Sequence, residues 1–324
     1  MFDLAAIGEI LIDFTMSRQQ EGPPLFTPNP GGAPANVACA LAKWGRKSAF
    51  IGKVGPDAFG ALCRSALQDA GVDTHGLLTS AGEPTTLAFV HLDETGNRSF
   101  SFYRHKMADV SLRAEEIPAA LLENARIFHF GSVSLTEEPA RSATIAAVQA
   151  AKRSGALISF DPNLRPPLWD SLKTARQEIL SLLPLADILK ISDDEAAFLF
   201  GGQDCQKLAA DIAGRYGSRL VLISRGPAGC AAAAGGKVYS SRAYDLHTID
   251  TTGSGDSFLA GVMHCILHHE GGLAAMNEEE IERMLDFANA VGSLVSTKKG
   301  AIPALPTEEQ VLACMQEEPR LMAD

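Results

Sequence analysis

Short apolar runs alternate with helix-length amphipathic segments along most of the chain. Runs of Ile, Leu, Val and Ala predict strands buried on both faces, as in a parallel sheet. The segments between them repeat apolar residues every three or four positions, which is typical of helices packed on one side. The predicted strands are 4–12, 48–54, 127–131, 157–161, 188–192 and 220–224. The predicted helices are 58–70, 139–154, 171–183, 194–200, 206–216, 278–295 and 307–315. This alternation predicts an α/β fold with helices on both faces of a mostly parallel sheet.

Two segments interrupt the alternation. Residues 17–30 are rich in proline and predict an extended loop or an edge hairpin. Residues 85–92 and 98–103 are rich in β-forming side chains and flank a turn-like stretch at 93–97, so they predict a second hairpin. We therefore expect one domain over residues 1–324, with a small β lid from about 14–30 and 85–105.

Composition and charge exclude several classes of protein. The chain has 324 residues, 46% of them hydrophobic, and a net charge of −11, which argues against a nucleic-acid or anionic-membrane partner. Its six cysteines show no metal-type spacing and are expected to be free thiols in a reducing compartment. Residues 1–12 lack the basic cluster of a signal peptide, and no apolar run is long enough to span a membrane. A cytoplasmic location is the expectation.

Residues 250–258, DTTGSGDSF, combine a candidate anion site with a carboxylate. Gly253, Ser254 and Gly255 precede an apolar helical pattern, so their N–H groups would lie at a helix N-terminus, which attracts anions. Asp256 in the first turn could accept a proton from an alcohol. Together these features suit phosphoryl transfer to a hydroxyl group. The alternative is a glycine turn followed by an ordinary first-turn aspartate.

Polar residues also follow several predicted strands, where open parallel sheets bind ligands. These residues are Asp13, Asp161, Asn163, Arg165, Ser192, Glu195, Ser224 and Gly226. Each alone could be a helix cap or a turn residue, whereas all of them at one sheet edge would form a site. The sequence lacks the Walker A, protein-kinase, GxSxG, HExxH and GxGxxG patterns, which weakens the classes of enzyme that depend on them.

Residues 31–38, GGAPANVA, and residues 250–258 together resemble the two signatures of the ribokinase-like (PfkB) carbohydrate kinases, in the family's order and separation. The resemblance covers nearly the whole chain, and FYR at 102–104 and DPNLR at 161–165 are most similar to bacterial fructokinases. It implies a ribokinase-like three-layer α/β/α sandwich with a small β-strand lid. It also implies an ATP-dependent sugar kinase that converts D-fructose to fructose 6-phosphate.

The resemblance further implies roles for individual residues. Asp256 would deprotonate the sugar hydroxyl, the amides of Gly253, Ser254 and Gly255 would stabilise the migrating γ-phosphoryl group, and Arg165 would reach the sugar or the phosphate. The implied sugar-binding residues are Asp13, Gly31, Gly32, Asn36, Phe102, Tyr103, Arg104, Asn163, Arg165 and Asp256. The implied nucleotide-binding residues are Ser192, Ser224, Gly226, Gly229, Gly253, Gly255 and Asn289.

The resemblance also implies bound cations, and the predicted lid implies a second subunit. Glu195 would hold Mg²⁺ through water, in a motif that has Ser192 where the family has asparagine. Asp250 and Thr252 resemble a loop that binds a monovalent cation, K⁺. The lid would otherwise expose apolar strand faces, so we expect a homodimer joined through it.

Other functions stay open at this point. Arg104 and Arg165 could equally grip a carboxylate, which would suit a 2-keto-3-deoxygluconate kinase. A ribokinase or a nucleoside kinase would use the same fold. A non-catalytic sugar or nucleotide sensor is disfavoured by the intact Asp256, and a dehydrogenase by the missing dinucleotide fingerprint.

Overall fold

The computed structural model describes residues 1–17, 23–92, 98–202 and 204–321. Its main sheet has nine strands: β1 (Phe2–Ile7), β4 (Ser48–Val54), β5 (Asp73–Thr79), β8 (Ala125–Gly131), β9 (Leu157–Asp161), β10 (Ile188–Ser192), β11 (Leu220–Ser224), β12 (Cys230–Ala234) and β13 (Lys237–Ser241). They lie in the order β13-β12-β11-β10-β9-β8-β1-β4-β5. From β11 to β5 the neighbours are parallel, whereas β12 and β13 add an antiparallel edge.

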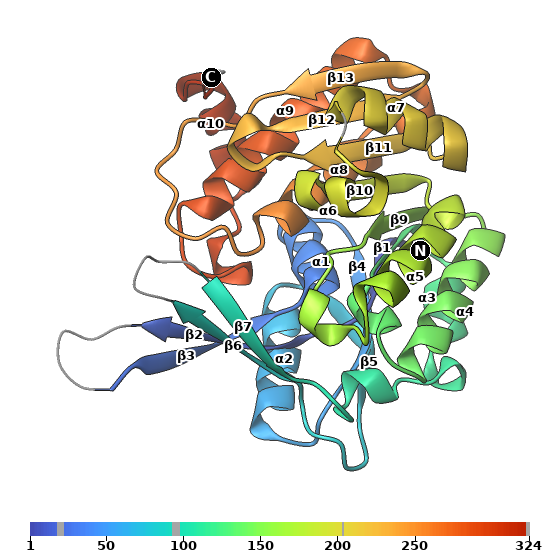
Figure 1. Ribbon diagram of the computed structural model, residues 1–324, viewed down its shortest axis with the longest axis vertical. Helices are drawn as coiled ribbons and strands as arrows, with labels where there is room; N and C mark the ends of the chain where they lie inside the picture. The colour runs from blue at the N-terminus through green and yellow to red at the C-terminus, as the bar shows by residue number, and fades with distance from the viewer. Residues whose placement is uncertain (18–22, 93–97, 203, 322–324) are drawn as a thin grey trace.

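Helices cover both faces of this sheet (Figure 1). One face carries α1 (Ala33–Lys43), α2 (Ala58–Asp69), α8 (Ser254–His268), α9 (Glu278–Ser296) and α10 (Glu308–Glu317). The other carries α3 (Ala119–Glu123), α4 (Ala140–Arg153), α5 (Leu172–Leu182), α6 (Asp193–Phe200) and α7 (Cys205–Tyr216). Strand β10 shows why both faces must be apolar: Ile188 packs in the first core and Leu189 in the second. The predicted three-layer α/β architecture is confirmed.

A second sheet lies beside the main one. Its strands are β2 (Leu11–Ser17), β3 (Leu25–Gly31), β6 (Leu87–Leu92) and β7 (Arg98–Tyr103), in the order β3-β2-β6-β7. Figure 1 shows it projecting from the body of the molecule. Strands β3, β6 and β7 fall where the sequence predicts hairpins, whereas β2 begins inside the predicted first strand. We call this sheet the lid. The turn predicted at 93–97 lies outside the described residues, as do residues 18–22 of the proline-rich segment.

The first strand is shorter than the sequence predicts, and Asp13 therefore belongs to a different strand from the predicted one. A single strand over 4–12 is the expectation, but β1 ends before Gly8 and the chain turns there into β2. Gly8 has φ +152, and a Cβ atom on it would lie 2.7 Å from Cγ of Pro34. The apolar pattern hides this break because residues 10–12 are also buried. Asp13 therefore belongs to the lid and not to the end of β1.

The helices of the described residues contain no segment long and apolar enough to cross a membrane.

Candidate active site

The N-terminus of α8 lies where two cavities meet. Gly253 caps it with φ 76 and ψ −2, and no side chain of the described residues hydrogen-bonds to the cap. A Cβ atom at Gly253 would lie 2.5 Å from Cβ of Ala301, so only glycine fits. Thr251 and Gly255 line both cavities. The first-turn N–H groups of α8 thus lie between the two cavities, where the predicted anion site would be, and their binding of an anion stays a prediction.

Asp256 is held in place by two amide side chains. Its Oδ2 accepts a hydrogen bond from Nδ2 of Asn36 at 2.8 Å, and its Oδ1 accepts one from Nδ2 of Asn163 at 3.3 Å. Burial raises the pKa of Asp256 above its ordinary value, while the Asn36 hydrogen bond and the charges of Lys190 and Arg165 lower it. A carboxylate with a raised pKa is a stronger proton acceptor. The geometry therefore suits a general base.

The larger cavity, about 870 Å³, contains most of the predicted sugar-binding residues. Its lining includes Asp13, Gly32, Asn36, Phe102, Asn163, Arg165 and Asp256. They come from the lid, from the start of α1, from the loop after β9 and from α8. Carboxylate and amide groups can read the hydroxyls of a neutral polyol by donating and accepting hydrogen bonds.

The pKa of Asp13 is higher than is usual for an aspartate. Burial raises its pKa to about 6; the Arg165 guanidinium lowers it, and the Asp256 and Asp250 carboxylates raise it further. A Cβ atom on Gly31 would lie 2.6 Å from Oδ2 of Asp13, so Gly31 leaves room for this carboxylate without itself lining the cavity.

Besides Gly31, two further predicted sugar-binding residues, Tyr103 and Arg104, do not line the cavity. Tyr103 is 58% exposed and packs on Phe89, with ring centroids 5.6 Å apart. Arg104 is buried, and its Nε donates to Oδ2 of Asp109 at 2.7 Å. Within the described residues its Nη2 has no hydrogen-bond partner. A contact between Arg104 and a sugar therefore remains a prediction, and Nη2 is the atom that could make it.

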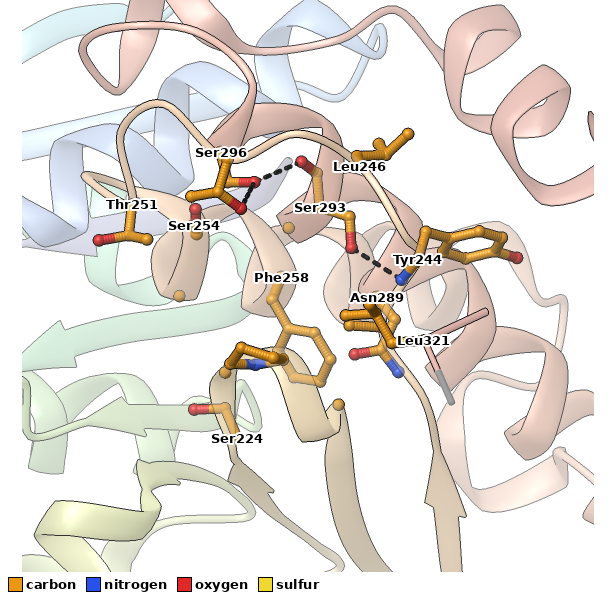
Figure 2. A pocket seen from close by; sticks show the side chains of 17 residues that line it. Ser224, Tyr244, Leu246, Thr251, Ser254, Phe258, Asn289, Ser293, Ser296 and Leu321 are labelled. Atoms are coloured by element: carbon orange, nitrogen blue, oxygen red, sulfur yellow. Dashed lines mark hydrogen bonds between the residues drawn. The ribbon is translucent and has the colours of Figure 1, made fainter. Parts of the chain in front are cut away.

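The smaller cavity, about 360 Å³, contains five of the seven predicted nucleotide-binding residues, all except Ser192 and Gly253, on the other side of α8 (Figure 2). Ser224, Gly226, Gly229 and Asn289 line it. Gly229 has φ +79, and a Cβ atom there would lie 2.0 Å from the carbonyl oxygen of Ser241, so the turn requires glycine. The apolar lining includes Phe258 from the 250–258 motif, and also Tyr244, Leu246 and Leu321, which the sequence did not single out. Such a mixture suits a flat aromatic ligand with a polar edge.

Glu195 and Ser192 form a capping box at the start of α6. The Glu195 carboxylate accepts hydrogen bonds from the backbone N–H groups of Leu164 at 2.6 Å and Ser192 at 2.8 Å. The Ser192 hydroxyl in turn accepts one from the Glu195 N–H at 3.1 Å. Neither residue lines the cavities, but Asp194 beside them lines the larger one. The structural role of Glu195 is to fix the loop after β9 against β10.

Asp250 fixes the loop that enters α8. It is buried, and its two carboxylate oxygens accept hydrogen bonds from the N–H groups of Thr252 at 2.7 Å and Gly300 at 3.0 Å. Among the described residues, no group of three or more His, Cys, Asp or Glu side chains is arranged to hold a metal ion.

Sequence reasoning gave no role to two charged residues at the site, Lys190 and Glu9. Lys190 lines the larger cavity and forms an ion pair with Asp161, with Nζ and Oδ2 at 2.9 Å. Glu9 also lines it, and its Oε1 accepts a hydrogen bond from the Ala33 N–H at 2.9 Å. Burial raises the pKa of Glu9 to about 7, against the lowering effect of backbone hydrogen bonds. For Lys190 the available signal was its charge, because it lies within a buried strand of mainly apolar residues.

An anion-binding helix N-terminus, a buried carboxylate and a polar cavity opposite a nucleotide-sized one define a kinase with a small alcohol as acceptor. The chain belongs to the pfkB family of carbohydrate kinases, whose model matches residues 1–308. It is a sugar phosphotransferase, as the two glycine-rich motifs predict.

Individual relatives support this assignment. The chain is 44% identical to probable fructokinase-6, chloroplastic, of Arabidopsis thaliana over 319 residues, which cover 95% of this chain and 81% of the relative. It is 42% identical to fructokinase-1 of Oryza sativa subsp. japonica, with 97% of each chain covered.

Solved structures agree with the fold. Fructokinase with bound ATP from Xylella fastidiosa superimposes with a TM-score of 0.87 at 33% identity, covering 98% of this chain and 99% of the other. A fructokinase double mutant from Vibrio cholerae O395 in a fructose, ADP and potassium ion bound form gives a TM-score of 0.88 at 32% identity, with 97% and 98% covered. The ribokinase-like fold is confirmed.

Proposed function

We propose that this chain is an ATP-dependent fructokinase that converts D-fructose to fructose 6-phosphate. The observation that carries the proposal is the position of Asp256, at a helix N-terminus shared by two cavities and hydrogen-bonded by Asn36 and Asn163. The fructokinase relatives, one with fructose and ADP bound, support the same substrates.

In the proposed reaction the sugar occupies the larger cavity, with Asp13 and Asn36 at its hydroxyls, and the nucleotide occupies the smaller one. Asp256 accepts the proton of the sugar hydroxyl, and the oxygen of that hydroxyl forms a bond to the γ-phosphorus. The bond between that phosphorus and the β,γ-bridging oxygen breaks, and ADP leaves. The N–H groups at Gly253 and Gly255 stabilise the charge on the transferred group.

A hydrated Mg²⁺ ion carried by the nucleotide fits the residues present. Mg²⁺ in kinases typically binds substrate phosphates, retains water ligands and uses one or two carboxylates. Asp194 lines the cavity, and Glu195, which is hydrogen-bonded to two backbone groups, would act only through water. When bound, the ion would neutralise phosphate charge. The loop at Asp250 and Thr252 is the proposed site for K⁺.

A coupled ADP-release assay tests the proposed substrates. Fructose, ribose, 2-keto-3-deoxygluconate and adenosine are supplied in turn with ATP, and fructose is expected to give the highest kcat/KM. Coupling to an enzyme specific for fructose 6-phosphate checks the position of transfer. A higher kcat/KM for any other acceptor would overturn the choice of fructose but not the class of enzyme.

Fructose binding is expected to weaken as the pH falls through the pKa of Asp13. That pKa is about 6, so the carboxylate that accepts hydrogen bonds from sugar hydroxyls becomes protonated below this value. Titration of a group with this pKa predicts about tenfold weaker binding at pH 5 than at pH 7. Calorimetric titration with fructose measures it, and Asp13→Asn serves as the control. An equal pH dependence in Asp13→Asn would show that another group is responsible.

We propose that two copies associate through the outer face of the lid. Phe14 and Phe89 stack there with centroids 4.8 Å apart, Phe26 packs on Phe89, and Tyr103 is 58% exposed beside them. The cluster is half-buried apart from the exposed Tyr103, and a partly exposed aromatic cluster of this kind is typical of an interface.

Replacing the exposed member of this cluster should separate the copies. Tyr103→Lys is expected to shift the light-scattering mass from that of two chains to that of one, because it places a charge in the apolar interface. Leu172→Lys is the matched control, since Leu172 is 50% exposed on α5, away from the lid. A wild-type protein that scatters as a single chain, or a Tyr103→Lys variant that stays paired, would refute the interface.

A cytoplasmic, reducing location is the accompanying proposal, supported by the six free cysteines. Fractionation of the source cells checks it, and activity recovered inside an oxidising compartment would contradict it.

A further inference from the structure

The ion pair between Lys190 and Asp161 lies directly against the start of α8. The two side chains are 7% and 1% exposed, and Nζ is 2.9 Å from Oδ2 of Asp161. A Cβ atom on Gly255 would lie 2.9 Å from the same Nζ. The ammonium group therefore occupies the space that a side chain at residue 255 would fill, next to the N–H groups that bind the anion.

Lys190 keeps its charge in this position. Burial lowers its pKa, but the carboxylates of Asp161 and Glu195 raise it above the ordinary value. Among the described residues, the recorded acceptor for the ammonium is Asp161 Oδ2. An ammonium group has three N–H donors, so donors remain for a ligand in the cavity that Lys190 lines.

A purely structural role explains this arrangement poorly. A buried ion pair costs desolvation energy and can often be replaced by apolar side chains without loss of stability. The neighbours of Lys190 in β10 are apolar and fully buried, whereas Lys190 reaches the cavity wall. Here the charge lies where the proposed reaction collects negative charge.

We propose that Lys190 is a catalytic residue whose ammonium group contacts the phosphoryl group during transfer, and that Asp161 is the residue that positions it. The inference rests on the proposed phosphoryl transfer. A fixed cation beside the helix N-terminus adds to the stabilisation that the backbone N–H groups give to the transferred group. It also explains why residue 255 is a glycine, because the ammonium group needs the space that a side chain there would fill.

Three variants test the proposal: Lys190→Met, Lys190→Arg, and the double variant Lys190→Met with Asp161→Asn. The double variant removes both charges and leaves no unpaired buried ion. Both Met variants are expected to lose roughly 100-fold in kcat, as for the loss of one charge-stabilising donor, with KM for fructose within about threefold of wild type. Lys190→Arg keeps a cation and is expected to retain more than a tenth of kcat.

A second readout separates transition-state stabilisation from folding. Aluminium fluoride, which mimics the transferred phosphoryl group, should tighten ADP binding to the wild-type protein with fructose present and have little effect on either Met variant. Recovery of near-wild-type kcat in the double variant would overturn the proposal, as would a Lys190→Arg variant as slow as Lys190→Met. Wild-type turnover of fructose is the baseline, and its absence would refute the proposed substrate. The role of Lys190 is tested separately, by the ratio of variant to wild-type kcat with the preferred sugar.

Discussion

We expect Asp256→Asn to lower kcat for fructose phosphorylation on the order of 10³-fold, because it removes the general base. Asparagine has nearly the same shape, so the fold and the sugar cavity should persist. The Asn36 side chain can adapt, since its Oδ1 has no hydrogen-bond partner among the described residues and could accept from a new amide at residue 256. Fructose affinity is therefore expected to stay within a few-fold of wild type.

ADP release gives kcat for this variant, and calorimetry gives the dissociation constant of fructose. Asp211→Asn is a suitable control, because Asp211 is exposed on α7 and belongs to neither cavity. A kcat for Asp256→Asn within tenfold of wild type would remove Asp256 as the base.

The second large effect is expected for Gly253→Ala. The added Cβ would lie 2.5 Å from Cβ of Ala301, so the loop that enters α8 must move and carry the anion-binding N–H groups with it. Misplacing one such donor typically costs 10²–10³-fold in rate, so we expect roughly a 100-fold loss in kcat/KM for ATP.

Gly217→Ala is the matched control for this experiment. Gly217 has the same φ of 76 as Gly253 and ends α7, but nothing lies within 4 Å of a Cβ placed on it. Both substitutions force alanine into a left-handed conformation, which costs about 1 kcal/mol of stability. Steady-state kinetics with varied ATP, together with thermal unfolding, separates strain from loss of function. Equal activity in the two variants would mean that the close packing of Gly253 is irrelevant to catalysis.

The layered fold follows from the sequence because each buried strand is a continuous apolar run. Strands β9, β10 and β11 have the bounds that the pattern predicts. The hydrophobic pattern fails where the position of a strand depends on which other strands it pairs with. The edge strand β5 is too polar to stand out, since Asp73, Thr74 and His75 begin it. The break at Gly8 is hidden because the residues on both sides of it are buried.

The site could be predicted only as far as its motifs reach. The glycine-rich segments locate Asn36 and Asp256, whose hydrogen bond joins residues 220 positions apart. No sequence pattern shows that Lys190 meets Asp161, because their contact depends on β9 and β10 being neighbours in the sheet. Arg104 illustrates the reverse case: its residue type suits a substrate contact, yet in the fold it pairs with Asp109.

The most direct test of the account is a structure determined with fructose and ADP bound. We expect the C6 hydroxyl oxygen within about 3 Å of an Asp256 carboxylate oxygen, facing the terminal phosphate of ADP at the N-terminus of α8. Fructose bound with no hydroxyl near Asp256, or ADP with its phosphates away from α8, would contradict it.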